Sequence, residues 1–270
     1  AEYFAERARG GVGLIITGGI SPNEEGGGGA KLANAEEVAR HRVITDAVHE
    51  ADPEVKICMQ ILHAGPLVRS EACVAPSAVA SPIGGYTPRE LDEAGIEKQL
   101  SDLLSTFLVR KTNLRTDKWG GSYENRMRFP LEVVRRVRAA VSEDFIVIFR
   151  IAAMDMLQDG MSWEEIVQLA KALEKEGVSI ISTHFTWHES AVPTIATMVP
   201  RAAFTSVTGR LRKEVSVPMI TSNRINMPDV AEGVLARGDA DLVSMARPML
   251  ADSQFMVKAA EGREDEINTC

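Results

Sequence analysis

The sequence has few cysteines, no excess of positive charge and no long apolar run. Its three cysteines, Cys58, Cys73 and Cys270, lie far apart, so they provide no disulfide framework and a reducing compartment is expected. The net charge of −8 argues against nucleic acid or an anionic membrane as the main partner. No apolar stretch approaches the ~20 residues of a membrane span, and we expect no signal peptide. These absences predict a cytoplasmic protein that acts on a small molecule.

The usual nucleotide-binding loops are also missing. The segment Gly18–Ser21 is too sparse in glycine for a GxGxxG fingerprint, and no P-loop lysine pattern occurs. The segment Gly26–Gly29 follows no strand and opens no clear helix, so we interpret it as a flexible loop. An open doubly wound sheet would usually carry a glycine-rich loop after its first strand, and its absence disfavours that fold.

One pattern occurs six times: a short apolar run that ends in glycine or a polar residue and usually precedes a helix-like stretch. The runs are Gly13–Thr17, Ile57–Leu62, Ile146–Ile151, Ser179–Thr183, Pro218–Ser222 and Asp241–Met245. Continuous apolar strands that alternate with helices predict a parallel sheet covered on both faces. With 270 residues available, we predict an α/β protein of the (β/α)8 TIM-barrel type, although that barrel needs eight such units.

The expected helices carry their own start signals. Capping boxes at Thr87–Glu90 and Ser162–Glu165 predict helices that run toward Leu104 and to about Glu176. Helical patterns also cover 1–10, 125–141 and 226–237. Pro130 is expected near the first turn of its helix, where proline is tolerated.

The interval between Leu62 and Ile146 is unusually long. It has room for another strand–helix unit, yet the only strand-like run in it is the weak Thr106–Val109. The helix that begins at Thr87 runs into this segment without a turn signal. The sequence therefore shows six units where a barrel needs eight.

Several polar residues lie at or near the carboxyl ends of the predicted strands, which converge on one mouth in a parallel barrel. Gln60 lies inside an apolar strand, so its amide needs either a core partner or the polar edge of a heteroaromatic ligand. Arg150 ends its strand, either as an ion-pair residue or as a fixed positive charge for a ligand. Arg224 and Arg247 follow the last two strands, where barrels often bind phosphate. Each of these two arginines alone could equally be a solvated or structural charge.

The loop after the fourth run contains a candidate acid–base residue. His188 lies beside Glu189 and could polarise or protonate a carbonyl near neutral pH, although a lone histidine is as often structural. His184 is a weaker candidate, and His63 is expected to shape the exit of its strand. No group of histidines and cysteines has the spacing of a zinc site.

These positions and several longer motifs resemble the flavin barrel of the Old Yellow Enzyme superfamily, and within it the bacterial NADPH-dependent 2,4-dienoyl-CoA reductases. The motifs are YFAERARGGVGLIITGGI, QILHAG, TNLRTDKWGGSYENRMRFPLEVV, WHESAVPTIATMVPRAAF, SNRINMPDVAEGVLARGDADLVSMARPMLAD and GREDEINTC. The resemblance implies an FMN-binding barrel over 1–262 and the start of an iron–sulfur segment at 263–270. In full-length relatives it also implies FAD, a 4Fe–4S cluster and NADPH.

The resemblance assigns roles to individual residues. The positions that match its FMN contacts are Gly19, Gln60, Arg150, Arg224, Ala246 and Arg247. Gln60 and Arg150 would face the pyrimidine end of the flavin, where Arg150 would stabilise the negative charge of the reduced ring. His188 and Glu189 match the substrate-contacting HEAR motif, and His188 would polarise an enoyl or dienoyl thioester, or another enone, during hydride transfer. Cys270 matches the first cysteine of the cluster motif.

The chain also departs from the family. The first strand of the barrel is missing, and the fourth unit would lie where Leu104 meets Ser105. That unit normally ends in Gly-Tyr, whose tyrosine protonates the substrate, and none of the three tyrosines here matches it. The glycine-rich segment before the Trp-His-Glu sequence is replaced by the bulkier 183–186, and the arginine of HEAR is also replaced. The identity of the substrate and of the proton donor is therefore open.

Three interpretations follow. The chain could be the FMN domain of an ene-reductase with residues missing at one junction, in which case Leu104 and Ser105 are not joined. It could be a deleted, non-catalytic homologue that binds FMN or nothing. It could also be a related flavin dehydrogenase of the trimethylamine dehydrogenase group.

Overall fold

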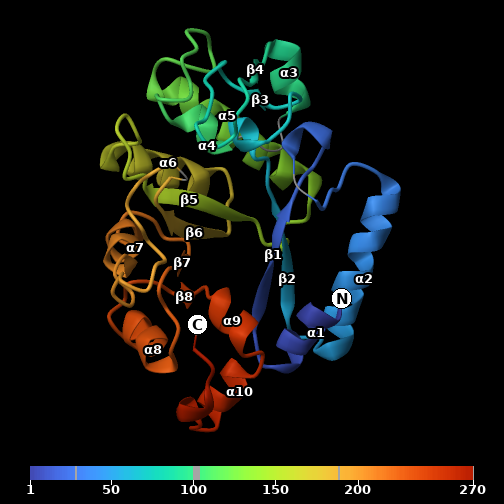
Figure 1. The fold of residues 1–270 in the computed structure, drawn as a ribbon, viewed down its shortest axis with the longest axis vertical. Coiled ribbons are helices and arrows are strands. Elements are labelled where there is room, and N and C mark those ends of the chain that lie inside the picture. Colours follow the sequence, from blue (N-terminus) through green and yellow to red (C-terminus); the bar gives the residue numbers. More distant parts are fainter. Residues whose placement is uncertain (28, 100–103, 188, 270) are drawn as a thin grey trace. The chain divides into compact units, whose positions relative to one another are not determined.

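The computed structural model describes residues 1–27, 29–99, 104–187 and 189–269 (Figure 1). The chain divides into two compact units. Unit 1 consists of Ala1–Ala64, Asn226–Pro228 and Met245–Cys270, and unit 2 consists of Gly65–Ile225 and Asp229–Ser244. Within the described ranges, no helix combines the length and the apolar character that crossing a membrane requires.

Unit 1 is built on two parallel strands. Its elements are α1 (Glu2–Arg9), β1 (Leu14–Ile20), η1 (Glu24–Gly26), α2 (Ala35–Ala51), β2 (Lys56–Ile61), α9 (Arg247–Ala251), α10 (Phe255–Ala260) and η3 (Glu264–Glu266). Strands β1 and β2 pair in register from Leu14 opposite Lys56 onward. A small core of Ala8, Ile15 and Val48 joins the helices to β1 because apolar residues of the strand and of both helices meet there.

Unit 2 contains a four-stranded parallel sheet in the order β5-β6-β7-β8. Its strands are β5 (Ile148–Met154), β6 (Ile180–Phe185), β7 (Met219–Thr221) and β8 (Leu242–Val243), with a short pair β3 (Val74–Ala75) and β4 (Arg89–Glu90). Its helices are η2 (Gly65–Leu67), α3 (Glu93–Lys98), α4 (Leu104–Leu108), α5 (Tyr123–Ala140), α6 (Trp163–Lys175) and α7 (Thr205–Arg212). Helix α8 (Pro228–Ala236) begins at the border with unit 1.

The six predicted strands are confirmed, and each pairs in parallel with its neighbour. The capping box before α6 is also confirmed, since the side chains of Ser162 and Glu165 each accept a hydrogen bond from the other residue's backbone amide.

Apolar residues of β5 and β6 pack against α6 and form the largest core of the unit, which includes Phe149, Ile151 and Leu169. In the described part of 104–147, no strand follows β4 before β5 begins, which agrees with the predicted loss of one barrel strand.

The predicted helix at Thr87–Glu90 is wrong. Arg89 and Glu90 form β4, and the helix begins only at Glu93, where the side chain of Asp92 accepts a hydrogen bond from the amide of Gly95 at 2.7 Å. Backbone oxygens around this segment accept hydrogen bonds from the distant Arg115. Long-range contacts thus override the local capping signal.

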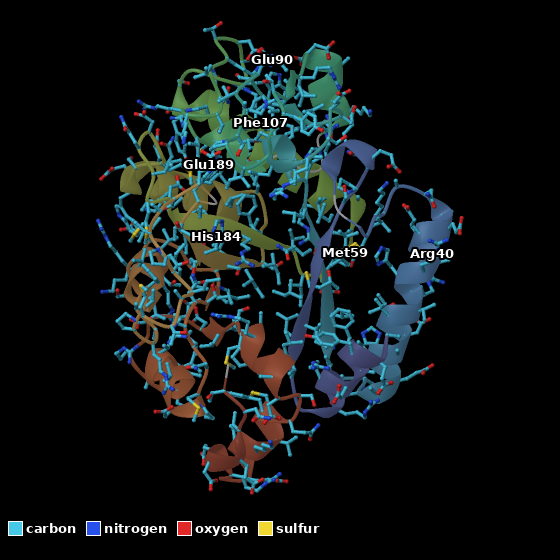
Figure 2. All side chains as sticks on the ribbon, viewed as in Figure 1. Arg40, Met59, Glu90, Phe107, His184 and Glu189 are labelled. Carbon is cyan, nitrogen blue, oxygen red and sulfur yellow. The ribbon has the colours of Figure 1, made fainter. Side chains whose placement is uncertain are left out.

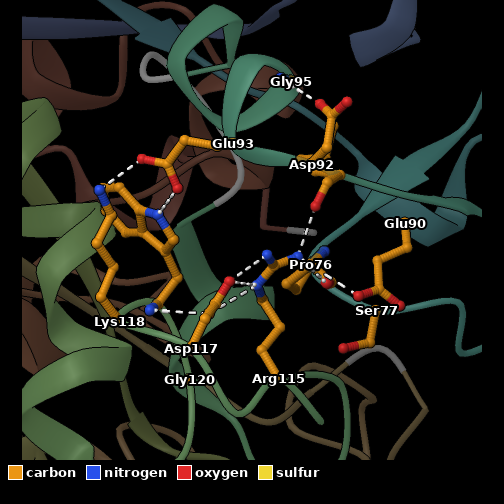
Figure 3. A network of polar contacts seen from close by, with 12 residues as sticks. Pro76, Ser77, Glu90, Asp92, Glu93, Gly95, Arg115, Asp117, Lys118 and Gly120 are labelled. Carbon is orange, nitrogen blue, oxygen red and sulfur yellow. Dashed lines mark hydrogen bonds and ion pairs between the residues drawn. The ribbon is translucent and has the colours of Figure 1, made fainter.

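Arg115 organises these contacts (Figure 3). Its guanidinium donates to the backbone oxygens of Pro76 at 3.0 Å and Leu91 at 2.5 Å, and it also forms an ion pair with Asp117. The nearby indole of Trp119 donates to Glu93 at 2.9 Å. This network fixes the segments around β3, β4 and α3 as extended chain and a short helix.

Two other local predictions are corrected. Pro130 lies well inside α5 rather than in its first turn, because Ser122 caps the helix and starts it at Tyr123. The weak strand predicted at Thr106–Val109 falls largely within α4. Leu104 and Ser105 are the first two residues of α4. Whether residues are missing at this junction, or the fourth unit is truly deleted, stays a prediction.

Candidate functional site

Backbone strain is concentrated at the carboxyl ends of the four-stranded sheet. Six described non-glycine residues have positive φ: Met156, Asp159, Thr186, Ala202, Asn223 and Arg224. All six lie in the connections that follow β5, β6 and β7. Conformations of this kind cost free energy and cluster at functional sites, so this edge is the structural candidate for the mouth of a site.

Thr186 is the most costly of these residues, because a β-branched side chain at φ 77° is strained. We expect Thr186→Gly to raise the free energy of unfolding of unit 2 by about 1 kcal/mol, since relief of the strain exceeds the added entropy of the unfolded chain. Urea denaturation measures this change. The matched control is Thr87→Gly, an exposed position without positive φ, which should lose stability. Equal losses in both variants would contradict the assignment of strain.

The face of β6 that packs on α7 is defined by two contacts. The hydroxyls of Thr183 and Thr208 lie 2.8 Å apart, and the rings of Phe185 and Phe204 stack at 5.3 Å. Successive side chains of a strand point to opposite faces. Ser182 and His184 therefore belong to the other face of the sheet, which we call the inner face.

Arg150 lies on the same inner face. Its strand neighbours Phe149 and Ile151 pack into the helix-side core, and Arg150 pairs in register with Ser182 of β6. Within the described ranges its guanidinium makes no hydrogen bond or ion pair, and the surrounding protein lowers its pKa by desolvation. The alternative of an ion pair with Asp or Glu is thus not observed. An arginine stays charged at any ordinary pH, so the inner face carries an uncompensated positive charge.

In unit 1, β1 and β2 position two predicted residues. Gly19 pairs with Gln60 after an irregularity in β1, where the hydroxyl of Thr17 accepts the amide of Gln60 at 3.0 Å. A Cβ on Gly19 would lie 2.4 Å from Leu62 Cδ2, whereas Gly18 faces open space. The side-chain amide of Gln60 has no hydrogen-bond partner among the described residues, so the prediction of a satisfied core glutamine is not supported.

His63 closes β2 in unit 1 as predicted. It is buried beside η1, and a Cβ on Gly26 would approach the imidazole to 3.1 Å. Burial lowers the pKa of His63 from 6.5 to about 4, against a smaller opposing effect of Glu25. The ring is therefore neutral at pH 7.

This shifted pKa predicts acid sensitivity of unit 1. Between pH 6.5 and pH 4 the unfolded chain binds a proton that the folded chain does not, so stability falls as the pH falls through this window. The shift corresponds to a loss of about 3 kcal/mol in the free energy of unfolding, and this loss is complete below about pH 4. Hydrogen exchange of the β1 and β2 amides measures it. His63→Gln should reduce the loss, whereas the exposed His49→Gln should leave it intact. An unchanged pH dependence in His63→Gln would contradict this assignment.

Arg224 lies in the connection after β7 with φ 58°. Its guanidinium donates to the backbone oxygens of Val199 at 2.9 Å and Thr197 at 3.3 Å, and it has no carboxylate partner in the described structure. Carbonyls position the group without neutralising it, so it keeps its charge for an anion. In unit 1, Ala246 is the N-cap of α9 and makes no side-chain capping hydrogen bond; Arg247 is the first residue of that helix.

Glu189, labelled in Figure 2, has its polar partners within unit 2. Its carboxylate binds Lys111 Nζ at 2.8 Å and accepts a hydrogen bond from Ser81. Burial alone would raise the pKa of Glu189, but these hydrogen bonds hold it below its usual value. Sequence reasoning missed Lys111, because 78 residues separate it from Glu189 and no local pattern connects them. The predicted residues His188 and Cys270 lie outside the described residues.

Neither a metal-binding cluster nor a surface hollow provides an alternative site in the described part of the chain. Within the ranges that the structure describes, no group of three or more His, Cys, Asp or Glu residues could hold a metal ion. A hollow of about 230 Å³ is lined by Arg212, Pro218 and Asp241 at the amino-terminal end of β7. That end of a parallel barrel supports stability rather than catalysis, so the hollow is not the candidate site.

Comparison with known proteins decides the family. The profile of the NADH:flavin oxidoreductase / NADH oxidase family matches residues 1–102 and 90–266. The chain belongs to this family. The match in two overlapping segments agrees with a discontinuity near the predicted missing unit.

The chain is similar to two known proteins and to one solved structure. A metal reductase of Desulforamulus reducens is 35% identical, and an NADH oxidase of Thermoanaerobacter brockii is 34% identical. Both alignments cover the whole chain but only 44% and 46% of the relatives, so the chain spans less than half of their length. The structure of a 2-naphthoyl-CoA reductase in complex with 2-naphthoyl-CoA superposes with a TM-score of 0.92 at 29% identity. The superposition covers 100% of this chain and 47% of the reductase chain.

These similarities bear on the fold and the cofactor class of the chain. Its structural relatives include Old Yellow Enzyme homologues, which confirms the predicted TIM-barrel class. The alignment with the metal reductase extends over 299 positions, more than the 270 residues of the chain. Some positions of the relatives therefore have no counterpart here. FMN is the cofactor that the family implies.

Proposed function

We propose that this chain is the FMN-binding barrel of an ene-reductase that transfers hydride to an activated C=C bond, such as that of a 2,4-dienoyl-CoA thioester. The observation that carries the proposal is Arg150, an unpaired arginine on the inner face of a parallel sheet. Membership of a flavin oxidoreductase family supports the cofactor, and similarity to a structure solved with a CoA thioester supports the substrate class.

The residues present fit a flavin mononucleotide. The uncompensated charge of Arg150 suits a ring that becomes negative on reduction. The unpartnered amide of Gln60 can donate to and accept from a heteroaromatic edge. Arg224 keeps an unneutralised guanidinium for phosphate, and Arg247 with the amides after Ala246 offers a second set of donors.

Bound FMN would supply the two-electron hydride chemistry. The chain's own residues would then bind and orient the reactants. Arg150 would hold positive charge at the pyrimidine edge, and His188 would polarise the carbonyl next to the reacting double bond. Glu189 is fixed by Lys111, so we assign it a role in positioning its loop rather than in proton transfer. Cys270 would contribute one ligand to a 4Fe–4S cluster, and the full-length protein would also use FAD and NADPH.

The test of this function separates cofactor binding from turnover. The purified chain is loaded with FMN, reduced anaerobically with dithionite, and mixed with an enoyl or dienoyl thioester. We expect the flavin absorption band to return as the alkene is reduced. A band that returns only with an added amine oxidation product would favour the trimethylamine dehydrogenase group. No bound flavin would favour the deleted, non-catalytic homologue.

A further inference from the structure

His184 lies on the inner face of the unit 2 sheet, in the same layer of side chains as the candidate site. Thr183 and Phe185 on either side of it contact Thr208 and Phe204 on the α7 side, so the imidazole belongs to the opposite face. It pairs in register with Ala152 of β5.

The pairing register also shows how far along the strand direction His184 lies relative to Arg150. Arg150 is opposite Ser182, and His184 is two residues farther along β6. Since a parallel strand rises about 3.3 Å per residue, His184 lies about 7 Å nearer the carboxyl ends of the strands than that pair. Ligands of parallel barrels enter from this end. If Arg150 faces a flavin, His184 is one level closer to the entrance, where a substrate stacked on the ring would lie.

We propose that His184 is the proton donor for the substrate carbon that does not receive the hydride. This inference rests on the proposed function. Bound reduced FMN would supply the hydride, two electrons with one proton, to the β-carbon and would become oxidised. The N–H of the imidazolium or imidazole breaks as a new C–H bond forms at the α-carbon. Solvent then reprotonates the ring, so the alkene gains two hydrogens overall.

The tyrosines of the chain are the alternative to His184, because a phenol can also act as the general acid that protonates a substrate carbon. The sequence has three. Tyr3 lies in α1 with its ring against Arg7, and Tyr86 is exposed in the loop before β4. The hydroxyl of Tyr123 is buried in α5 and donates to Met161 sulfur at 3.6 Å. Tyr3 belongs to unit 1, and neither Tyr86 nor Tyr123 is a residue of the β5–β8 strands.

The first test needs no variant. Diethyl pyrocarbonate modifies accessible histidines, and peptide mapping distinguishes the five in this chain. We expect FMN together with an unreactive saturated thioester to slow modification of His184 several-fold while leaving His49 of α2 unchanged. Equal rates of His184 modification with and without both ligands would overturn the proposal.

The second test uses His184→Gln with His49→Gln as the matched control. In the FMN-loaded, dithionite-reduced protein, reoxidation by an enoyl thioester should slow about 100-fold in His184→Gln only, as expected for loss of a general acid. Reoxidation by molecular oxygen, which needs no carbon protonation, should be unchanged in both. Normal reoxidation of His184→Gln by the thioester would overturn the inference alone. Failure of the unmodified chain to be reoxidised would instead overturn the proposed function.

Discussion

Replacement of Arg126 by alanine is expected to lower the free energy of unfolding of unit 2 by about 3–5 kcal/mol. The Arg126 side chain is only 1% exposed, and its guanidinium pairs with Glu165 at 2.5 Å and donates to the backbone oxygen of Leu108. The ring of Tyr123 lies 4.8 Å from it. Without Arg126, Glu165 keeps the exposed Arg110 at 3.4 Å and the backbone amide of Ser162 at 3.1 Å. A largely buried carboxylate would then lose most of its compensation, and a cavity would remain.

The chain offers a direct measurement of this effect. All three tryptophans, Trp119, Trp163 and Trp187, belong to unit 2, so their fluorescence during urea unfolding reports on this unit. The control is Arg135→Ala, which removes an exposed ion pair with Glu176 and should cost less than about 1 kcal/mol. Similar losses in the two variants would show that Arg126 does not hold this part of the structure.

Replacement of Arg150 by glutamine is expected to weaken FMN binding by about 10- to 100-fold, the equivalent of one lost hydrogen bond to a charged group. The same change should leave the stability of the flavin-free protein unchanged or raise it. Arg150 has no described partner to lose, and although its side chain is exposed, desolvation by the surrounding protein lowers the pKa of its guanidinium. A residue that serves binding rather than folding gives this combination of effects.

Flavin fluorescence titration measures the affinity, and urea unfolding of the flavin-free protein measures the stability. Arg212→Gln is the control, because Arg212 forms an exposed pair with Asp241 at the opposite end of the sheet. Its FMN affinity should match that of the unmodified chain. Unchanged FMN affinity in Arg150→Gln, or a loss of stability equal to that of Arg126→Ala, would contradict the assigned role.

The sequence predicted most of the sheet, because each strand is a continuous apolar run whose burial is decided locally. The run around Ile181, for example, becomes a central strand with both neighbours in parallel. It also predicted correctly that Arg224 follows a strand. The prediction that Arg150 ends its strand is wrong, because β5 continues past it to Met154. The sequence could not decide whether Arg150 forms an ion pair, since that depends on carboxylates brought near by the fold. The described structure shows none within reach.

The remaining differences arise from contacts between distant residues. The Thr87–Glu90 capping box is a correct local signal, but Arg115 holds the neighbouring Leu91 in an extended segment. The ion pair of Lys111 with Glu189 is likewise invisible in either local sequence. Thr186 gives a partial signal, because it replaces part of a glycine-rich segment in the resembling family and adopts a positive φ. The departure from glycine left the substrate open at the sequence level, and the structure adds that one of the replacing residues is strained.

The central claim is that the inner face of this chain holds one flavin. The most direct test is the stoichiometry of FMN released by heat from the purified, FMN-reconstituted chain after unbound flavin has been removed. The account predicts one FMN per chain for the unmodified protein and for Arg212→Gln, and a substoichiometric amount for Arg150→Gln. Absence of retained FMN in the folded, unmodified chain would contradict it.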